Sequence, residues 1–317
     1  MPASASPAEA LPIVSPLSNA FVRIAMDGKS PTLTRPQVEN YLAQNRRNLD
    51  SLLTAFHLTH DSALLREAEA NYPNDPRVSF AGWADTRRDN NSSPELRRQW
   101  LDAFKQSAPD NALANYLSAS EYLRSGQTDQ AVEELMAAAA KPKYQDYMAD
   151  HIQSAEEAYL SAGYSLADAK FEAYVFTTNP QLAGMKGLRD GLGELSSLYR
   201  QAGDEASAQA TLQIGLKLGQ QVSASGLYLV DDFFGLALQR QMLGKMDPAA
   251  PSDNGLAVQD QRNQVAARIE NLRALSTSEQ PILQTMSDQD LISFLDRLKV
   301  SGESAALQWA KNRMSPH

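Results

Sequence analysis

The spacing of apolar and polar positions is helical from about residue 34 to the end of the chain. Apolar side chains recur at intervals of three and four residues, which is the spacing of one helix face. The segment from 34 to 58 shows the pattern clearly, with apolar residues at Val38, Leu42, Leu49, Leu52, Leu53 and Phe56. The pattern predicts an all-α protein.

Capping and turn residues divide this pattern into separate helices. Thr34 with Gln37 has the spacing of a capping box, which opens a helix, and Pro73 and Pro76 stop the second helix. We expect helices at about 34–58, 62–71, 77–87, 94–106, 112–125, 128–140, 145–162, 166–176, 185–202, 205–222, 229–243, 256–275, 287–299 and from 301 onward.

A short phrase recurs three times at the ends of these helices. In each copy, at 122–126, 159–163 and 199–203, a tyrosine is followed four residues later by a glycine. Glycine suits the left-handed conformation that closes a helix. With Gly244, the elbow glycines are 37, 40 and 41 residues apart. Two helices per unit at this spacing predict an α-solenoid, in which helical hairpins stack side by side.

The region from 109 to 220 also carries a known packing pattern. Large, small, tyrosine, glycine and alanine positions fall at or beside Asn115, Ser118, Ala119, Tyr122, Gly126, Ala131, Leu135, Ala138 and Pro142, and again at Leu192, Leu195, Ser196, Tyr199, Gly203, Ala208, Leu212 and Gly215. These positions resemble the tetratricopeptide repeat. The unit around Tyr159 departs from it, because Asp168 takes an alanine position, and the match over the rest of 36–313 is weaker. The resemblance implies a right-handed superhelical array of antiparallel hairpins.

The tetratricopeptide resemblance also implies a groove for a protein or peptide, lined by the first helix of each hairpin. Carried over position by position, the lining comprises Tyr116, Ser120, Arg124, Ser197, Arg200 and Gln201. The alternative for each of them is a solvated or neighbour-packed residue, because the motif specifies packing and not a ligand.

Composition divides the chain into three parts. Residues 1–33 are rich in alanine, proline and serine and predict a flexible tail, in which 17–26 has helical spacing. This tail could dock on the body or tether the protein to a membrane or cell surface. We expect the repeat domain at 34–275 and C-terminal capping helices at 276–317, because terminal repeats cover an exposed face.

Charge and cysteine content exclude some classes of function. The net charge of −9 disfavours general binding to a phosphate backbone, and the absence of cysteine excludes disulfides, cysteine zinc sites and thiol nucleophiles. No apolar run approaches the roughly 18 residues that span a bilayer. Compartment is not fixed by these features, but the tail and the lack of cysteine favour an exported or periplasmic location over a cytoplasmic one.

Candidate catalytic and metal-binding residues are few. His57 and His60 are three residues apart and could share a helix face, but a zinc site needs at least one further ligand, so we interpret the pair as part of a helix end. His151 stands alone on its helix. Asp231 and Asp232 fit the first turn of a helix, where acids complement the dipole. The alternative is a carboxylate pair whose pKa values are raised by apolar neighbours.

Sequence motifs therefore predict no catalytic residue, cofactor or metal. The glycine-rich stretch at 184–193 does not follow a strand, as a phosphate-binding loop requires. We expect a non-enzymatic scaffold that binds a protein or peptide in a concave face. One alternative is a structural, envelope-associated protein that self-associates as a homo-oligomer. Another is a helical toroid enzyme acting on polysaccharide or lipid, which would need paired acids in one cleft.

Overall fold

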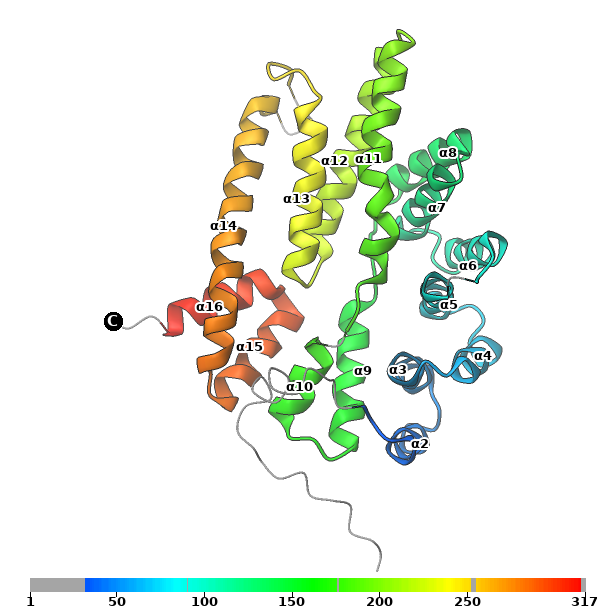
Figure 1. The fold of residues 1–317 in the computed structure, drawn as a ribbon, viewed down its shortest axis with the longest axis vertical. Helices are drawn as coiled ribbons and strands as arrows, with labels where there is room; N and C mark the ends of the chain where they lie inside the picture. Colours follow the sequence, from blue (N-terminus) through cyan, green and yellow to red (C-terminus); the bar gives the residue numbers. More distant parts are fainter. Residues whose placement is uncertain (1–31, 90, 176, 252–254, 315–317) are drawn as a thin grey trace, which may run out of the picture.

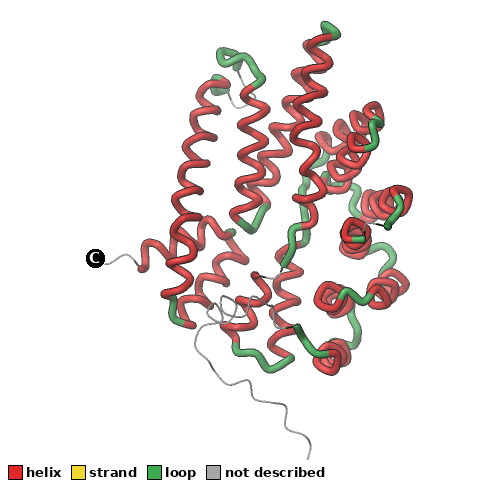
Figure 2. Tube along the Cα trace, viewed as in Figure 1, coloured by secondary structure: helices red, strands yellow, loops and turns green. Residues whose placement is uncertain are grey.

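The computed structural model describes residues 32–314, except 90, 176 and 252–254, and every regular element within them is an α-helix (Figure 2). This confirms the all-α prediction. The helices are α2 (Arg35–Gln44), α3 (Leu49–Thr59), α4 (Ser62–Asn71), α5 (Pro76–Arg88), α6 (Pro94–Ser107), α7 (Leu113–Arg124), α8 (Thr128–Ala140), α9 (Met148–Ser161), α10 (Leu166–Val175), α11 (Pro180–Gln201), α12 (Glu205–Ser225), α13 (Leu229–Gly244), α14 (Val258–Thr285), α15 (Asp288–Ser301) and α16 (Glu303–Met314).

Neighbouring helices pack in pairs, as in a helical-repeat fold. The pairs α3–α4, α5–α6 and α7–α8 follow one another along an arc (Figure 1). The chain then returns along the inner side of this arc, where α9 packs against α2 and α3, and α11 packs against α5 and α7. The long helices α12, α13 and α14 continue beside α11, and α15 and α16 close the fold against α10 and α14.

Three of the four expected elbow glycines have the predicted backbone. Gly126, Gly163 and Gly203 have φ angles of 73°, 91° and 79°, in the left-handed region that closes a helix. Gly244 differs, because it is the last residue of α13 and does not have a positive φ. The turn there begins one residue later, at Lys245, which is the C-cap of α13.

The first predicted helix is two helices, α2 and α3. Arg46 and Arg47 take positive φ angles of 55° and 50°, which interrupts the helix. Asn48 then caps α3, because its side chain accepts a hydrogen bond from the Ser51 N–H at 2.9 Å. The apolar stripe continues across the break, since Leu42 and Leu49 both lie in the core, and this continuity concealed the break in the sequence.

Helix α14 is longer than its pattern predicts. We expected it to end near residue 275, but it continues to Thr285 with Pro281 inside it. Ile282 and Leu283 beyond the expected end are buried, so packing holds the helix where its sequence is a weak helix former. The predicted boundary between repeat domain and capping helices therefore falls inside α14. Residues 1–31 of the predicted tail, with the stretch 17–26, lie outside the described residues.

Two clusters of buried side chains form the core. A small cluster joins α2, α3, α4 and the start of α5, and a large one extends from Phe80 in α5 to Ala310 in α16. Trp100 of α6 packs against both. The last two helices share the large cluster with the rest of the fold. Among the described helices, none combines the length and the apolar character that crossing a bilayer requires.

Helices α12 and α13 cross with their backbones in close approach at two glycines. A Cβ atom on Gly219 would lie 2.6 Å from the Gly235 carbonyl oxygen, and one on Gly235 would lie 2.4 Å from the Gly219 carbonyl oxygen. Because backbone atoms cannot yield as a side-chain tip can, Gly219→Ala should lower the free energy of unfolding by about 1–3 kcal/mol, measured by urea denaturation.

Gly187→Ala in α11 is the matched control for that substitution. Its Cβ would meet only the Ser120 hydroxyl, at 3.7 Å. Alanine restricts the unfolded chain and favours a helix, so Gly187→Ala should raise stability by up to about 1 kcal/mol. Equal effects from the two substitutions would contradict the close approach of α12 and α13.

Candidate functional site

A large cavity lies where the inner column of helices passes from α9 to α11. It has a volume of about 600 Å³ and is enclosed by α3 and α5 on one side and by α9, α10 and the start of α11 on the other. Thr177, Thr178 and Asn179, which link α10 to α11, form part of its wall. A smaller void of about 50 Å³ adjoins it and shares His57, Ala81, Ala84, His151, Thr178 and Pro180. A cavity of this size is within the range that holds small ligands or short peptide segments.

Small side chains explain why the space is not filled. Five alanines from four different helices face the cavity: Ala81, Ala84, Ala155, Ala173 and Ala183. Phe56 and Tyr159 add aromatic surface to the same wall. The cavity is therefore mainly apolar, with a few polar groups at defined positions, as is usual for a binding site.

Two histidines from different helices meet in this wall. The rings of His57 on α3 and His151 on α9 have their centroids 4.3 Å apart and planes inclined by 31°. Both rings keep accessible surface although they lie deep in the protein, because that surface faces the cavity. In the part of the chain that the structure describes, no hydrogen bond reaches their ring nitrogens. The pair thus offers unused hydrogen-bonding capacity to a ligand.

Burial keeps both rings neutral at pH 7. Loss of solvation lowers the pKa of His57 well below 6.5, and the neighbouring His151, His60 and Arg88 lower it further. Burial alone lowers the pKa of His151 to about 4. A neutral imidazole has one donor and one acceptor nitrogen, so each ring can give and receive one hydrogen bond.

Two arginines at the end of α5 lie on the cavity rim. Arg87 donates to the Glu121 carboxylate at 2.9 Å and to the Ala183 carbonyl oxygen at 3.5 Å, which ties α5 to α7 and α11. Arg88 is 4.0 Å from Asp85 one turn earlier and contacts the His60 ring. His60 itself is the C-cap of α3, with a φ of 56°, which confirms the interpretation of that histidine as part of a helix end.

Asn179 contributes a further polar group to the wall. Among the residues that the structure describes, its side-chain oxygen has no hydrogen-bond partner, and it has almost no accessible surface, so it does not face the open space of the cavity. Across the residues that the structure places, no three or more histidine, aspartate or glutamate side chains are arranged to hold a metal ion.

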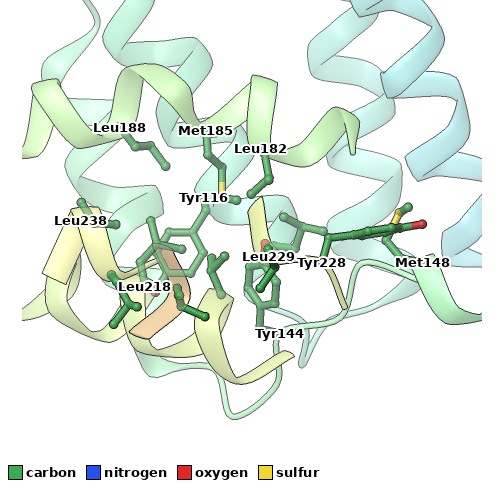
Figure 3. Packing of buried hydrophobic residues seen from close by; sticks show 14 of the residues in the cluster. Tyr116, Tyr144, Met148, Leu182, Met185, Leu188, Leu218, Tyr228, Leu229 and Leu238 are labelled. Atoms are coloured by element: carbon green, nitrogen blue, oxygen red, sulfur yellow. The ribbon is translucent and has the colours of Figure 1, made fainter. Parts of the chain in front are cut away.

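Two of the six residues carried over from the tetratricopeptide resemblance lie inside the fold. Tyr116 is fully buried among Leu182, Met185, Leu188 and Leu238, and its hydroxyl group is 3.0 Å from the Gln221 side-chain oxygen (Figure 3). Ser120 is also buried and donates to the Gly184 carbonyl oxygen at 2.7 Å. Both therefore hold α7 against its neighbours. Their predicted role in peptide binding stays a prediction.

The other four predicted residues lie nearer the surface. Arg124 is 55% exposed and pairs with Glu121, and Arg200 pairs with Glu205 at 3.2 Å. Ser197 and Gln201 line an open groove of about 560 Å³ between α11 and α13, together with Leu198 and Lys245 among others. The six residues therefore do not converge on one cavity, and none of them lines the cavity at α9 and α11.

A second polar cluster is enclosed where α10, α13 and α16 meet. Asp231 lies in the first turn of α13, as predicted, and its carboxylate accepts the Tyr228 N–H at 3.0 Å. Glu303 at the start of α16 accepts the Leu229 N–H at 2.6 Å and contacts the Tyr174 hydroxyl. Burial raises the pKa of Asp231 and of Glu303 to about 7, so the raised-pKa alternative applies to Asp231 as well.

Sequence reasoning missed the residues that line the cavity. His57 and His151 are 94 positions apart, and no local pattern connects them. His151 stands alone on its helix, as the sequence indicated, and its neighbour comes from another helix, because the return of α9 onto α3 places its ring against His57.

Comparisons with protein-family models, with curated protein sequences and with solved structures give no match. The paired packing of helices is thus established by the structure, and membership of the tetratricopeptide family is not shown by any match.

Proposed function

We propose that this protein is a non-enzymatic binding module that takes a short segment of a partner protein into the cavity between α3, α5, α9 and α11. The observation that carries the proposal is the cavity itself, of about 600 Å³, with mainly apolar walls and the paired rings of His57 and His151 as polar groups. Pockets of this composition are where proteins bind ligands.

The arrangement of the inner helices supports this cavity over an extended groove. In a tetratricopeptide-like array the first helices of the hairpins, here α3, α5 and α7, line the concave face. That face is covered by α9 and α11 of the same chain. We propose that the arc α3–α8 is such an array and that the return of the chain restricts binding to the space left between α9 and α11.

Site-directed crosslinking tests this proposal. A photo-crosslinking residue replaces Thr178 on the cavity wall or, in a second variant, Arg200 on α11, and each is exposed to extract from the native cell. We expect a partner segment to crosslink at position 178. The crosslink should be lost when Ala84→Phe fills the cavity, because Ala84 lines both the main cavity and the smaller void.

Two variants keep this test decisive. Ala206→Phe places the same side chain at an exposed position of α12 and should leave the crosslink intact. If circular dichroism shows that Ala84→Phe does not fold, Ala155→Leu fills the cavity from α9 instead. A crosslink that persists in the filled cavity, or one that forms at position 200 alone, would remove the cavity as the binding site.

A further inference from the structure

We infer that the occupant of the cavity is an uncharged, apolar peptide segment held through its backbone amides by the side chains of His57 and His151. This inference rests on the proposed function and adds the chemistry of the ligand. Three features of the wall lead to it: its unused hydrogen-bonding groups, its compensated charges and its apolar surface.

The unused groups match a peptide backbone. Each neutral imidazole offers one donor and one acceptor, and within the described residues no hydrogen bond uses them. A peptide unit presents one N–H and one C=O, both of which need partners when they leave water. His57 and His151 come from α3 and α9, and their ring centroids are 4.3 Å apart, so the two rings form one hydrogen-bonding position in the wall that can hold a peptide unit.

Charged groups in the main cavity already have partners or lie out of reach. Arg87 pairs with Glu121, and Arg88 faces Asp85 at 4.0 Å. Glu172 is only 2% exposed, and no lysine is among the described residues that line the cavity. A charged ligand would have to break one of these pairs or be buried without a counter-charge, which is costly. An uncharged segment meets no such penalty and gains from burial against the alanines and Phe56.

Acid should release such a ligand. Protonation of His57 or His151 removes the acceptor nitrogen and places a charge in the apolar wall. Because burial lowers the pKa of His151 to about 4, release is expected near pH 4 and not near pH 6. The charged and titratable groups that surround the two rings are Asp50 and His60 around α3, Arg77, Asp85, Arg87 and Arg88 on α5, Asp146, Tyr147, Asp150 and Tyr159 around α9, and Glu172 on α10.

A peptide library of defined chemistry tests the inference. The probe is a set of octapeptides built from Gly, Ala, Val, Leu, Ser and Thr, blocked by an acetyl and an amide group, and selected on the full chain with mass-spectrometric readout. The best peptide is then remade with one Glu or one Lys, and the dissociation constants are compared by calorimetry. We expect the uncharged peptide to bind most tightly, and the dissociation constant of each charged form to be at least about tenfold higher.

Variants assign the contacts within the cavity. His151→Phe keeps an aromatic ring against His57 but removes the hydrogen-bonding nitrogens, so it should lower the affinity for the uncharged peptide by about tenfold. The circular dichroism spectrum of this variant should be unchanged. Ala84→Phe should abolish binding. Arg88→Ala removes a positive charge from the cavity rim and tests whether that charge attracts a charged peptide. Arg273→Ala, with a similarly exposed arginine in an i,i+3 pair, is its control and should leave the affinity for the uncharged peptide unchanged.

Different failures have different meanings. Tighter binding of the Glu peptide that is lost in Arg88→Ala would overturn the inference while leaving the cavity as the site. No selected peptide, or an unchanged affinity in His151→Phe, would also overturn it. Peptide binding that Ala84→Phe does not affect would overturn the proposed function itself. A concentration-dependent dimer that Ala84→Phe abolishes would assign the cavity to a second copy of this chain.

Discussion

Trp83→Ala should lower the free energy of unfolding by about 3–5 kcal/mol, the largest effect that we expect from a single substitution in this chain. Trp83 is fully buried on α5, stacked on Phe80 with ring centroids 5.8 Å apart. It also packs against Gly184 of α11, where a Cβ atom would lie only 2.5 Å from the indole ring. Removal of this ring leaves a cavity at the joint between the outer arc and the inner column.

Urea denaturation of three variants measures this effect. Trp83→Phe keeps a ring in place and removes an indole N–H that has no hydrogen-bond partner, so it should cost markedly less than alanine. Trp309→Ala on α16 removes a tryptophan that is only partly buried beside Arg297, and it should also cost less. If Trp83→Ala and Trp309→Ala lowered the free energy of unfolding equally, the buried Trp83 side chain would contribute no more to stability than the partly buried Trp309.

Glu303→Gln should stabilise the protein at pH 8 by about 2–3 kcal/mol, with little effect at pH 4. Burial raises the pKa of Glu303 from 4.5 to about 7, and the nearby Glu279 adds to this, while hydrogen bonds from Tyr174 and the Leu229 N–H act in the opposite direction. One unit of pKa shift corresponds to about 1.4 kcal/mol. Glutamine can accept from the Leu229 N–H and donate to the Tyr174 hydroxyl, so the neutral substitute keeps both contacts.

The sign of the pH dependence follows from the raised pKa. The folded state holds the Glu303 proton more tightly than the unfolded state, so the contribution to stability is fully present below about pH 4 and is lost as pH rises toward 7. Melting temperatures of wild type and Glu303→Gln should therefore coincide at pH 4 and separate progressively up to pH 8. The charge of Glu303 also raises the pKa of Asp231, so Glu303→Gln removes an unfavourable interaction with that second carboxylate and strengthens the effect.

Glu270→Gln is the control for this pH series. Glu270 is 68% exposed in a surface pair with Arg273, and its substitution should change stability by less than about 0.5 kcal/mol at any pH. A constant difference between wild type and Glu303→Gln from pH 4 to pH 8 would show that Glu303 titrates normally in the folded protein.

Local sequence determined the elements of this fold. Apolar spacing gave the helices, and capping residues such as Ser93, whose hydroxyl accepts the Leu96 N–H at 3.1 Å, placed many of their ends. Glycine at 126, 163 and 203 specified the elbows, because glycine has no Cβ atom and adopts the left-handed conformation without a steric penalty. Helix caps and turns depend on residues within one or two helical turns of each other, so they can be predicted from the local sequence. The break between α2 and α3, just before Asn48, was missed because the apolar residues of the two helices follow one continuous helical spacing in the sequence.

Tertiary structure alone decided how the helices return and what they enclose. The packing of α9 on α3 and of α11 on α5 and α7 brings together residues that are 64 to 101 positions apart, such as Ser120 or Trp83 with Gly184. This return buries Tyr116 and Ser120, which a simple array would present on its concave face. It also brings His57 to His151 and leaves the alanine-lined cavity beside them. Periodicity says which face of a helix is buried but not which distant helix covers it, because many apolar faces are interchangeable until the whole chain is packed.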